Sequence, residues 1–237
     1  GNNGYIKNLE VCSFSDMDGK CGMFQMALYK TAEGRYYLYG ACFGGTHTGV
    51  MINEITDPYN PRFVKHFQLV DPVEYPTTTT PKIQIADDLL ICAMSAGSGP
   101  NALVEQSELK NMKCEVGIRI YSLKEDPENP KFLGYWDCGV PHSIGVHRFM
   151  YNGGRYVYLS CEHERFEGMI MRIIDIQDPT HPVEVGNWWS PEQFVDGYPG
   201  GTVDHTAPHV PSFMDKGWMH GPPFVRDGKA YLGYCGD

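Results

Sequence analysis

Three copies of one short phrase constrain this chain more than any other feature. Each copy is an apolar run that ends in Asp-Pro and meets a second proline three residues later. The prolines preset φ for a turn, and the Asp side chain accepts hydrogen bonds from the turn backbone. The phrase therefore predicts a hairpin corner between two strands, repeated at 57–61, 126–130 and 178–182.

A second repeated feature precedes each corner: a polar turn that opens a strand with alternating aromatic and β-branched residues. The copies of this feature are 34–39, 87–91, 153–159 and 227–234. No long segment has helical periodicity, so crossover helices are not expected. The repeating unit is therefore four antiparallel strands: A before the polar turn, B after it, C before Asp-Pro and D after it.

Four-strand repeats of this length are typical of a β-propeller. We predict an all-β fold with four-stranded antiparallel blades, in which this chain supplies about three and a half blades of a single, incomplete domain, 1–237. The predicted blades are 23–68, 82–137, 146–189 and, in part, 220–237, with an insertion around 95–115.

Propellers use four to eight blades, so the expected ring needs more strands than this chain supplies. We expect a second polypeptide, or a C-terminal half absent from this sequence, to complete it. The run 5–14 is expected to be a leftover D strand that closes the final blade.

The composition argues against two classes of partner. The formal net charge is −10, and no basic stripe is present to neutralise phosphates, so nucleic acid is not an expected partner. No apolar run approaches the eighteen or so residues of a membrane-spanning helix.

The eight cysteines do not have the spacing of a disulfide framework. Cys161 and Cys235 occupy the same repeat position, and equivalent strands of different blades are seldom close enough to bridge. We interpret the cysteines as small buried residues. Cys12 and Cys21 are the one pair whose spacing would close a loop, and the absence of Cys-x-x-Cys argues against a structural zinc site.

The histidines are concentrated on one face of the predicted disc. In a four-strand meander the D–A and B–C loops share one face, and the A–B and C–D turns share the other. Seven of the nine histidines map to the D–A and B–C face: His47, His142, His147, His163, His205, His209 and His220. His66, in a D strand, and His181, in a C–D corner, are assigned to structure.

Two of these histidines are predicted to begin inner strands. His147 and His220 occupy the start of strand A, which lines the channel, and Lys82 aligns with them. Imidazoles from separate blades can converge there on zinc, iron or copper. We predict a transition-metal site (Fe, Cu or Zn) built from His147, His220 and at least one of the other five. The alternative is that these imidazoles only bond to loop backbones.

Charged residues near this face supply further candidate roles. Glu162 and Glu164 are candidates to transfer protons, and Asp204 lies in the same set of loops. Arg148 or Lys82 would hold an anionic group of a substrate.

Three other segments are given structural interpretations. The segment 77–80 is expected to be a solvated connector, and Trp188-Trp189 to pack between blades. The segment 16–19 resembles the start of a calcium loop but lacks the later ligands of an EF-hand, so we expect a plain turn.

The repeat strands and corners together resemble the LVIVD repeat, a strand that runs into a Ser/Thr-Asp-Pro-x-x-Pro corner. The resemblance covers essentially the whole chain and rests on 117–123 with 126–130, on 171–176 with 178–179, and on 145–149 and 220–223. It implies a propeller, and it implies no particular activity. A looser similarity of architecture is to selenium-binding-protein-like methanethiol oxidases and carotenoid-cleaving oxygenases, propellers that hold a metal with axial histidines.

Two functional hypotheses follow. The first is a metal-dependent enzyme that acts on a small organic substrate at the axial mouth of the propeller. The second is a non-catalytic interaction module in which the same face binds a protein or a glycan. Metal content distinguishes them, because the module has no need of a tightly bound transition metal.

Overall fold

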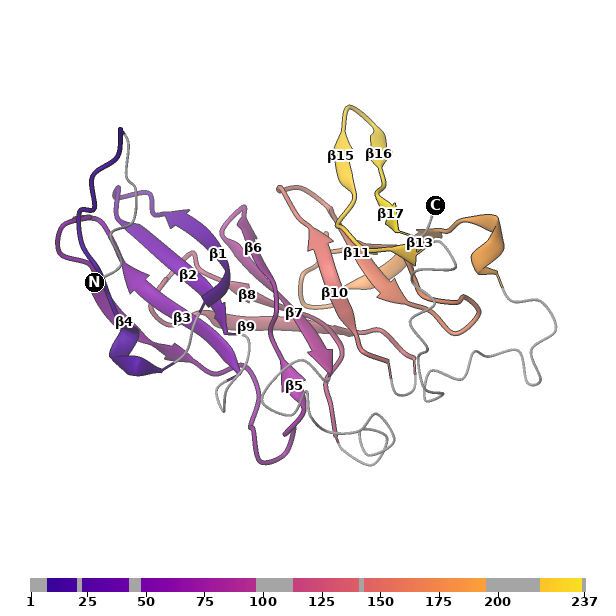
Figure 1. Cartoon of the computed structure of the whole chain (residues 1–237), viewed down its shortest axis with the longest axis horizontal. Coiled ribbons are helices and arrows are strands. Elements are labelled where there is room, and N and C mark those ends of the chain that lie inside the picture. Colours follow the sequence, from indigo (N-terminus) through magenta and orange to yellow (C-terminus); the bar gives the residue numbers. More distant parts are fainter. Residues whose placement is uncertain are drawn as a thin grey trace.

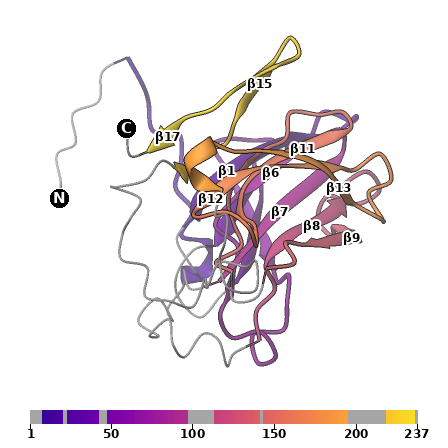
Figure 2. The same ribbon diagram turned by 90° about the vertical axis from the view of Figure 1, so that its right-hand side faces the viewer.

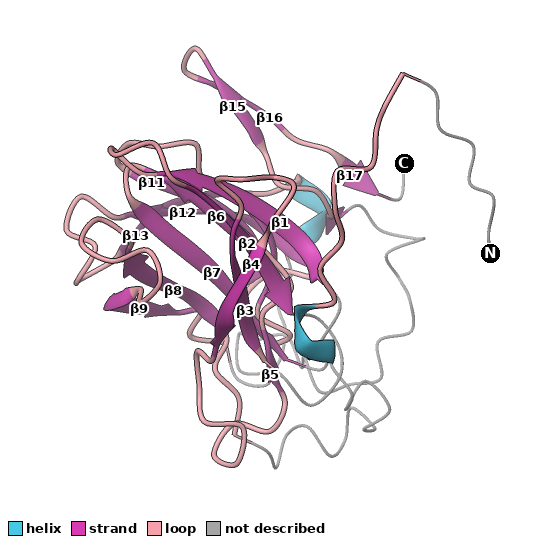
Figure 3. Cartoon of the chain, turned by 90° about the vertical axis from the view of Figure 1, so that its left-hand side faces the viewer, coloured by secondary structure: helices cyan, strands magenta, loops and turns pink. Residues whose placement is uncertain are grey.

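The protein is an all-β chain built from antiparallel sheets. The computed structural model describes residues 8–20, 23–42, 48–96, 113–140, 143–194 and 218–235. Strands are the main regular structure of these residues, and helical structure among them is confined to two short 3₁₀ turns, Met17–Gly19 and Pro191–Gln193 (Figure 3). None of the described helices has the length and apolar character needed to cross a bilayer.

Three antiparallel sheets follow one another as propeller blades, two of four strands and one in which β5 (Thr78–Thr79) adds a fifth, which confirms the predicted fold class. The first blade consists of β1 (Met23–Lys30), β2 (Tyr36–Cys42), β3 (Gly49–Glu54) and β4 (Arg62–Phe67). The second consists of β6 (Ile83–Ala86), β7 (Leu89–Ala96), β8 (Gly117–Ser122) and β9 (Lys131–Asp137). The third consists of β10 (Val146–Met150), β11 (Tyr156–Glu162), β12 (Met169–Asp175) and β13 (Val183–Trp188).

The blades lie side by side in chain order, and the core lies between them (Figure 1). One buried cluster joins the first two blades and includes Tyr39, Ile52 and Leu90. A second buried cluster joins the second and third blades and includes Ile118 and Leu159. Burial of apolar surface between the sheets therefore holds each blade against its neighbour.

A two-stranded extension follows the third blade and projects from the body (Figure 2). It consists of β14 (Trp218–Met219) paired with β17 (Tyr234–Cys235), and β15 (Phe224–Arg226) paired with β16 (Lys229–Tyr231). These pairs correspond to strands A and B of the predicted fourth blade. Pro222 and Pro223 lie at the break between β14 and β15, because proline has no N–H to donate to a ladder.

The Asp-Pro corners have the same hydrogen bonds in all three blades. Asp57, Asp126 and Asp178 each accept a bond of 2.9 Å at Oδ1 from the backbone N–H two residues later. Each corner also closes through the backbone, as in the 3.1 Å bond from the Asn60 N–H to the Asp57 carbonyl. The aspartate therefore fixes the turn, as the repeated phrase predicts.

Each D strand carries a bulge at the same place. The register shifts between Ile52 and Asn53 in the first blade, between Ile120 and Tyr121 in the second, and between Ile173 and Ile174 in the third. A bulge adds one residue to one strand and increases the local twist. The three blades therefore repeat in backbone geometry as well as in sequence.

The segment 77–80 corrects one expectation, because it is not a solvated connector. Thr78 and Thr79 form β5 (Thr78–Thr79), which pairs with the end of β7, and all four threonines are buried. Their hydroxyl groups satisfy the hydrogen bonding of this buried segment: Thr79 Oγ1, for example, donates to the Ser95 carbonyl at 3.2 Å. A threonine run reads as polar, but its β-branched side chains fit a buried strand.

The N-terminal run also departs from expectation. Asn8 to Phe14, the described part of the predicted closing strand, forms no strand, and Leu9 and Phe14 are more than 80% exposed. A strand forms only where a sheet edge accepts it, and no described edge pairs with this run.

The cysteines match the prediction in part. Cys92, Cys138 and Cys161 are free and buried, as expected for small apolar residues. Cys12 is free and exposed, so the one pair whose spacing would close a loop, Cys12 with Cys21, is not bridged and Cys12 is not a buried residue. Cys42 forms a disulfide instead.

The predicted turn at 16–19 holds, and the predicted packing of Trp188-Trp189 between blades holds for Trp188, whereas Trp189 packs on Phe166 of its own blade. Residues 17–19 form a 3₁₀ turn capped by the Asp16 carboxylate, which accepts from the Asp18 N–H at 3.1 Å. The ring of Trp188 packs edge-on against that of Tyr234 with centroids 5.7 Å apart, which is contact between the third blade and the extension.

Candidate functional site

Two glutamines hold the inner strands of successive blades together. Gln25 of β1 accepts a 3.0 Å bond from the backbone N–H of Ile83 at the start of β6. Gln84 of β6 bridges to β10, donating to the Phe149 carbonyl at 2.7 Å and accepting from the Tyr151 N–H at 2.5 Å. Gln25 therefore joins the starts of β1 and β6, and Gln84 joins β6 to the C-terminal end of β10.

The inner strands β10 and β1 each have a bulge near their first residues, which changes the direction of the side chains there. In β10, Val146 pairs with Cys161 and Arg148 pairs with Ser160, so His147 is the extra residue. In β1 the register shifts between Met23 and Met26, which places Phe24 in the bulged segment. Bulges of this kind often re-aim a side chain beside an active site.

His147 lies against His220. Their ring centroids are 5.1 Å apart, and the ring planes differ by 21°. His220 follows β14, which is anchored on the third blade because the Ser160 hydroxyl donates to the Met219 carbonyl at 2.5 Å. The extension therefore brings His220 to the level of His147.

Two cationic side chains adjoin the histidine pair. The Nε–H of Arg148 donates a long hydrogen bond of 3.5 Å to Nε2 of His147. Lys82 is 8% exposed, and its ammonium lies 3.5 Å from the centroid of the Phe24 ring. We call His147, His220, Arg148, Lys82 and Phe24 the mouth cluster.

The electrostatics of the mouth cluster keep both imidazoles neutral. Burial, and then the charges of His220, Arg148 and Lys82, lower the pKa of His147 to about 4. Burial, followed by the charges of Arg148 and Lys82, also lowers the pKa of His220. Burial and the charge of Arg148 lower the pKa of Lys82 to about 8, so at neutral pH most of its population is protonated.

The other described candidates lie elsewhere. Glu162 is buried, and its Oε2 accepts from the Ser143 hydroxyl at 2.7 Å and from the Ile144 N–H at 2.9 Å, so it fixes the loop before β10. Glu164 is exposed. His163 packs against the ring of Phe166 with centroids 5.1 Å apart, and not against the histidine pair.

The described residues contain only part of the predicted metal site. Four predicted ligands and one carboxylate lie outside the described residues: His47, His142, His205, His209 and Asp204. In the part of the chain that the structure describes, no group of three or more His, Cys, Asp or Glu side chains could hold a metal ion.

Sequence reasoning missed two arginines inside the blades. Arg172 of β12 is buried, forms an ion pair with Glu184 and donates to the carbonyls of Cys138 and Glu162 at 2.7 and 2.9 Å. Its guanidinium lies 4.6 Å from the centroid of the Trp136 ring. In the sequence, the only sign of this buried ion pair is an arginine between apolar residues of a C strand.

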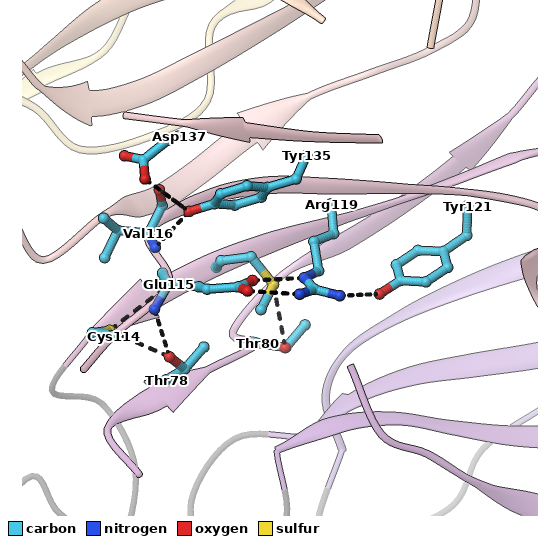
Figure 4. Close-up of polar contacts among 10 residues, drawn as sticks. Thr78, Thr80, Cys114, Glu115, Val116, Arg119, Tyr121, Tyr135 and Asp137 are labelled. Atoms are coloured by element: carbon cyan, nitrogen blue, oxygen red, sulfur yellow. Dashed lines mark hydrogen bonds and ion pairs between the residues drawn. The ribbon is translucent and has the colours of Figure 1, made fainter. Parts of the chain in front are cut away.

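Arg119 of β8 occupies the equivalent position in the second blade. It makes two bonds of 2.6 Å to Glu115, as a fork on a carboxylate, and Figure 4 shows the polar contacts around them. In the same group the hydroxyl of Tyr135 donates to the Val116 carbonyl at 2.9 Å, and Thr78 accepts from the Glu115 N–H at 2.8 Å. Each charge here has a partner, so we assign this group to structure.

Comparison with known proteins adds one solved structure. No protein-family model matches the chain, and no curated protein does so. Among solved structures the chain is similar to the periplasmic gluconolactonase PpgL of Pseudomonas aeruginosa, at 12% identity and a TM-score of 0.46. The match covers 68% of this chain and 38% of that one, so the chain spans well under half the length of that protein. The LVIVD assignment remains a prediction.

Proposed function

We propose that the protein is an enzyme that acts on a small organic substrate at the mouth cluster, with His147 as its general base. The observation that carries the proposal is the pair of adjacent neutral imidazoles, 5.1 Å apart, on a bulged inner strand and a neighbouring strand end. A neutral imidazole accepts a proton from water or from a substrate C–H or O–H.

The surrounding charges supply a means of tuning this base. A pKa of about 4 makes His147 a weak base in the unliganded protein, and burial and nearby positive charges are the causes. A bound negative group would offset those charges and raise the pKa of His147 towards neutrality. The base would then become effective when the substrate is in place, since the most effective catalytic pKa lies near the working pH.

A metal-dependent enzyme is the second candidate. Neutral imidazoles are the form that binds zinc, iron or copper, and His147 with His220 would supply two ligands. Further ligands would come from His47, His142, His163, His205 or His209. The charges of Arg148 and Lys82 oppose a bound cation, so we rank this candidate below metal-free general-base catalysis.

The test compares His147→Gln with His181→Gln in a screen for hydrolysis and dehydration of small esters, lactones and hydroxy acids. We expect His147→Gln to lower kcat/KM by at least about 100-fold, the usual contribution of a general base. His181 is a matched control, because it lies in an exposed corner where it contacts Asp178. His181→Gln should keep full activity.

Elemental analysis of the native protein and of the double variant His147→Gln/His220→Gln separates the two candidates. Stoichiometric metal that is lost from the double variant would favour the metal-dependent enzyme. Turnover that survives unchanged in His147→Gln and in His220→Gln would contradict either form of the proposal. A native protein without turnover and without stoichiometric metal would favour an interaction module.

A further inference from the structure

We infer that the mouth cluster binds the oxyanion group of its substrate, a carboxylate or phosphate, between Lys82 and Arg148. This inference deepens the proposed function by naming the substrate class, and it rests on that proposal for the reaction that follows. The binding step itself can be measured without turnover.

The first line of evidence is the contrast between these cations and the other arginines inside the blades. Arg119 is paired with Glu115, and Arg172 with Glu184. Among the described residues, no carboxylate forms an ion pair with Lys82 or Arg148, although Lys82 is 92% buried. A buried charge is normally paired, so we infer that a ligand supplies the anion that the described residues do not.

The second line of evidence is the position of the ammonium group. It lies 3.5 Å from the centroid of the Phe24 ring, whose face attracts a cation without neutralising it. Phe24 is 52% exposed, so this contact lies beside solvent. The ring contact therefore holds the ammonium in place, and its N–H groups can donate to a ligand that enters beside Phe24.

The third line of evidence is the second cation and its surroundings. Arg148 lies close enough to Lys82 for its charge to lower the lysine pKa, and its Nε–H faces His147. The guanidinium and the ammonium together favour an oxyanion. Both neighbouring imidazoles are neutral, so they do not repel a charged ligand. A bound oxyanion would also place the rest of the substrate next to His147.

A purely structural role for Lys82 makes a different prediction. A lysine retained only for its aliphatic chain could be replaced by methionine without any change in ligand binding. Lys82→Met and Arg148→Met keep most of the apolar volume and remove the charge. Lys30→Met is the matched control, because Lys30 makes a cation–π contact with Tyr36 at 5.2 Å on the exposed end of β1.

The experiment titrates the full chain with inorganic phosphate and with propionate at constant ionic strength, following the ¹³C-labelled histidine side chains by NMR. We expect both the wild type and Lys30→Met to bind at least one probe with a millimolar Kd, shifting the His147 signal. Lys82→Met and Arg148→Met should each weaken that binding by at least about tenfold, the effect of losing a charge-assisted hydrogen bond. Preference for one probe assigns the group as phosphate or carboxylate.

The pH dependence supplies a second readout. Because Lys82 loses its proton with a pKa of about 8, binding by the wild type should weaken as the pH rises above that value. Wild-type affinity in both Met variants, or no shift of the His147 signal at roughly 100 mM of either probe, would overturn the inference. Binding that persists while His147→Gln keeps full turnover would leave the inference standing and defeat the proposed function.

Discussion

Replacing Arg172 with methionine is expected to destabilise the protein by about 3 to 5 kcal/mol, the cost of breaking a buried charge pair. The variant leaves the Glu184 carboxylate without its partner and the Cys138 and Glu162 carbonyls without their donor. It also removes the cation from the face of Trp136, at the junction of the second and third blades. Urea unfolding followed by circular dichroism measures the change.

Two further variants separate this buried pair from ion pairs in general. Arg155 forms a 2.6 Å ion pair with Asp175, but its side chain is 51% exposed, so Arg155→Met should change stability only slightly. The double variant Arg172→Met/Glu184→Leu removes both charges and should recover much of the lost stability. A single Arg172→Met variant as stable as Arg155→Met would show that the buried network contributes little.

Gly117→Ala is expected to cost more than about 3 kcal/mol, because both the backbone and the packing at this position exclude a side chain. Gly117 has φ of +144°, and an added Cβ would lie 1.9 Å from the backbone oxygen of Trp136. The obstruction is backbone of the neighbouring strand, which cannot move without separating β8 from β9. Thermal unfolding of the variant measures the effect.

Gly34→Ala isolates the contribution of backbone conformation. Gly34 has φ of +85°, but an added Cβ would meet nothing within 4 Å. Strain in φ alone should cost about 1 kcal/mol. Equal losses in the two variants would mean that the second blade relaxes around the extra methyl group at Gly117.

The sequence was sufficient to predict the blades, because their corners depend on local chemistry. Asp57, Asp126 and Asp178 each bond to the backbone two residues later, so the turn is specified by neighbours in the chain. The alternation of apolar residues in the strands then follows from burial on the faces between blades.

The features that the sequence could not specify depend on contacts between distant segments. A bulge interrupts each D strand, and nothing in the residues around Gly134 or Gly186 signals it. The burial of 77–80 depends on β7 and on the carbonyl of Ser95, which lie in a later strand. The polar composition of 77–80 therefore led to the wrong prediction that the segment is solvated.

The candidate site was predicted in part for the same reason. His147 and His220 were placed at one level by strand direction, and the structure brings their rings together. The carboxylates were misjudged, because Glu162 satisfies a buried loop and Glu164 faces solvent. The lack of an ion-pair partner for Lys82 among the described residues is visible only in three dimensions.

The most direct test of the central claim is a pH titration of the histidine side chains by NMR, from about pH 3.5 to 9, in the wild type and in His147→Gln. We predict that the signal missing from the variant has a pKa of about 4, because burial and the charges of His220, Arg148 and Lys82 disfavour the imidazolium.

The same shift links protonation to folding. Since the pKa of His147 is lower in the folded protein than in the unfolded one, stability is fully present above about pH 6.5 and falls as the pH drops through 4, by up to about 3 kcal/mol relative to His147→Gln. A pKa of 6.5 or higher for the signal assigned to His147, with the same acid stability in both proteins, would contradict the neutral imidazole pair on which the account depends.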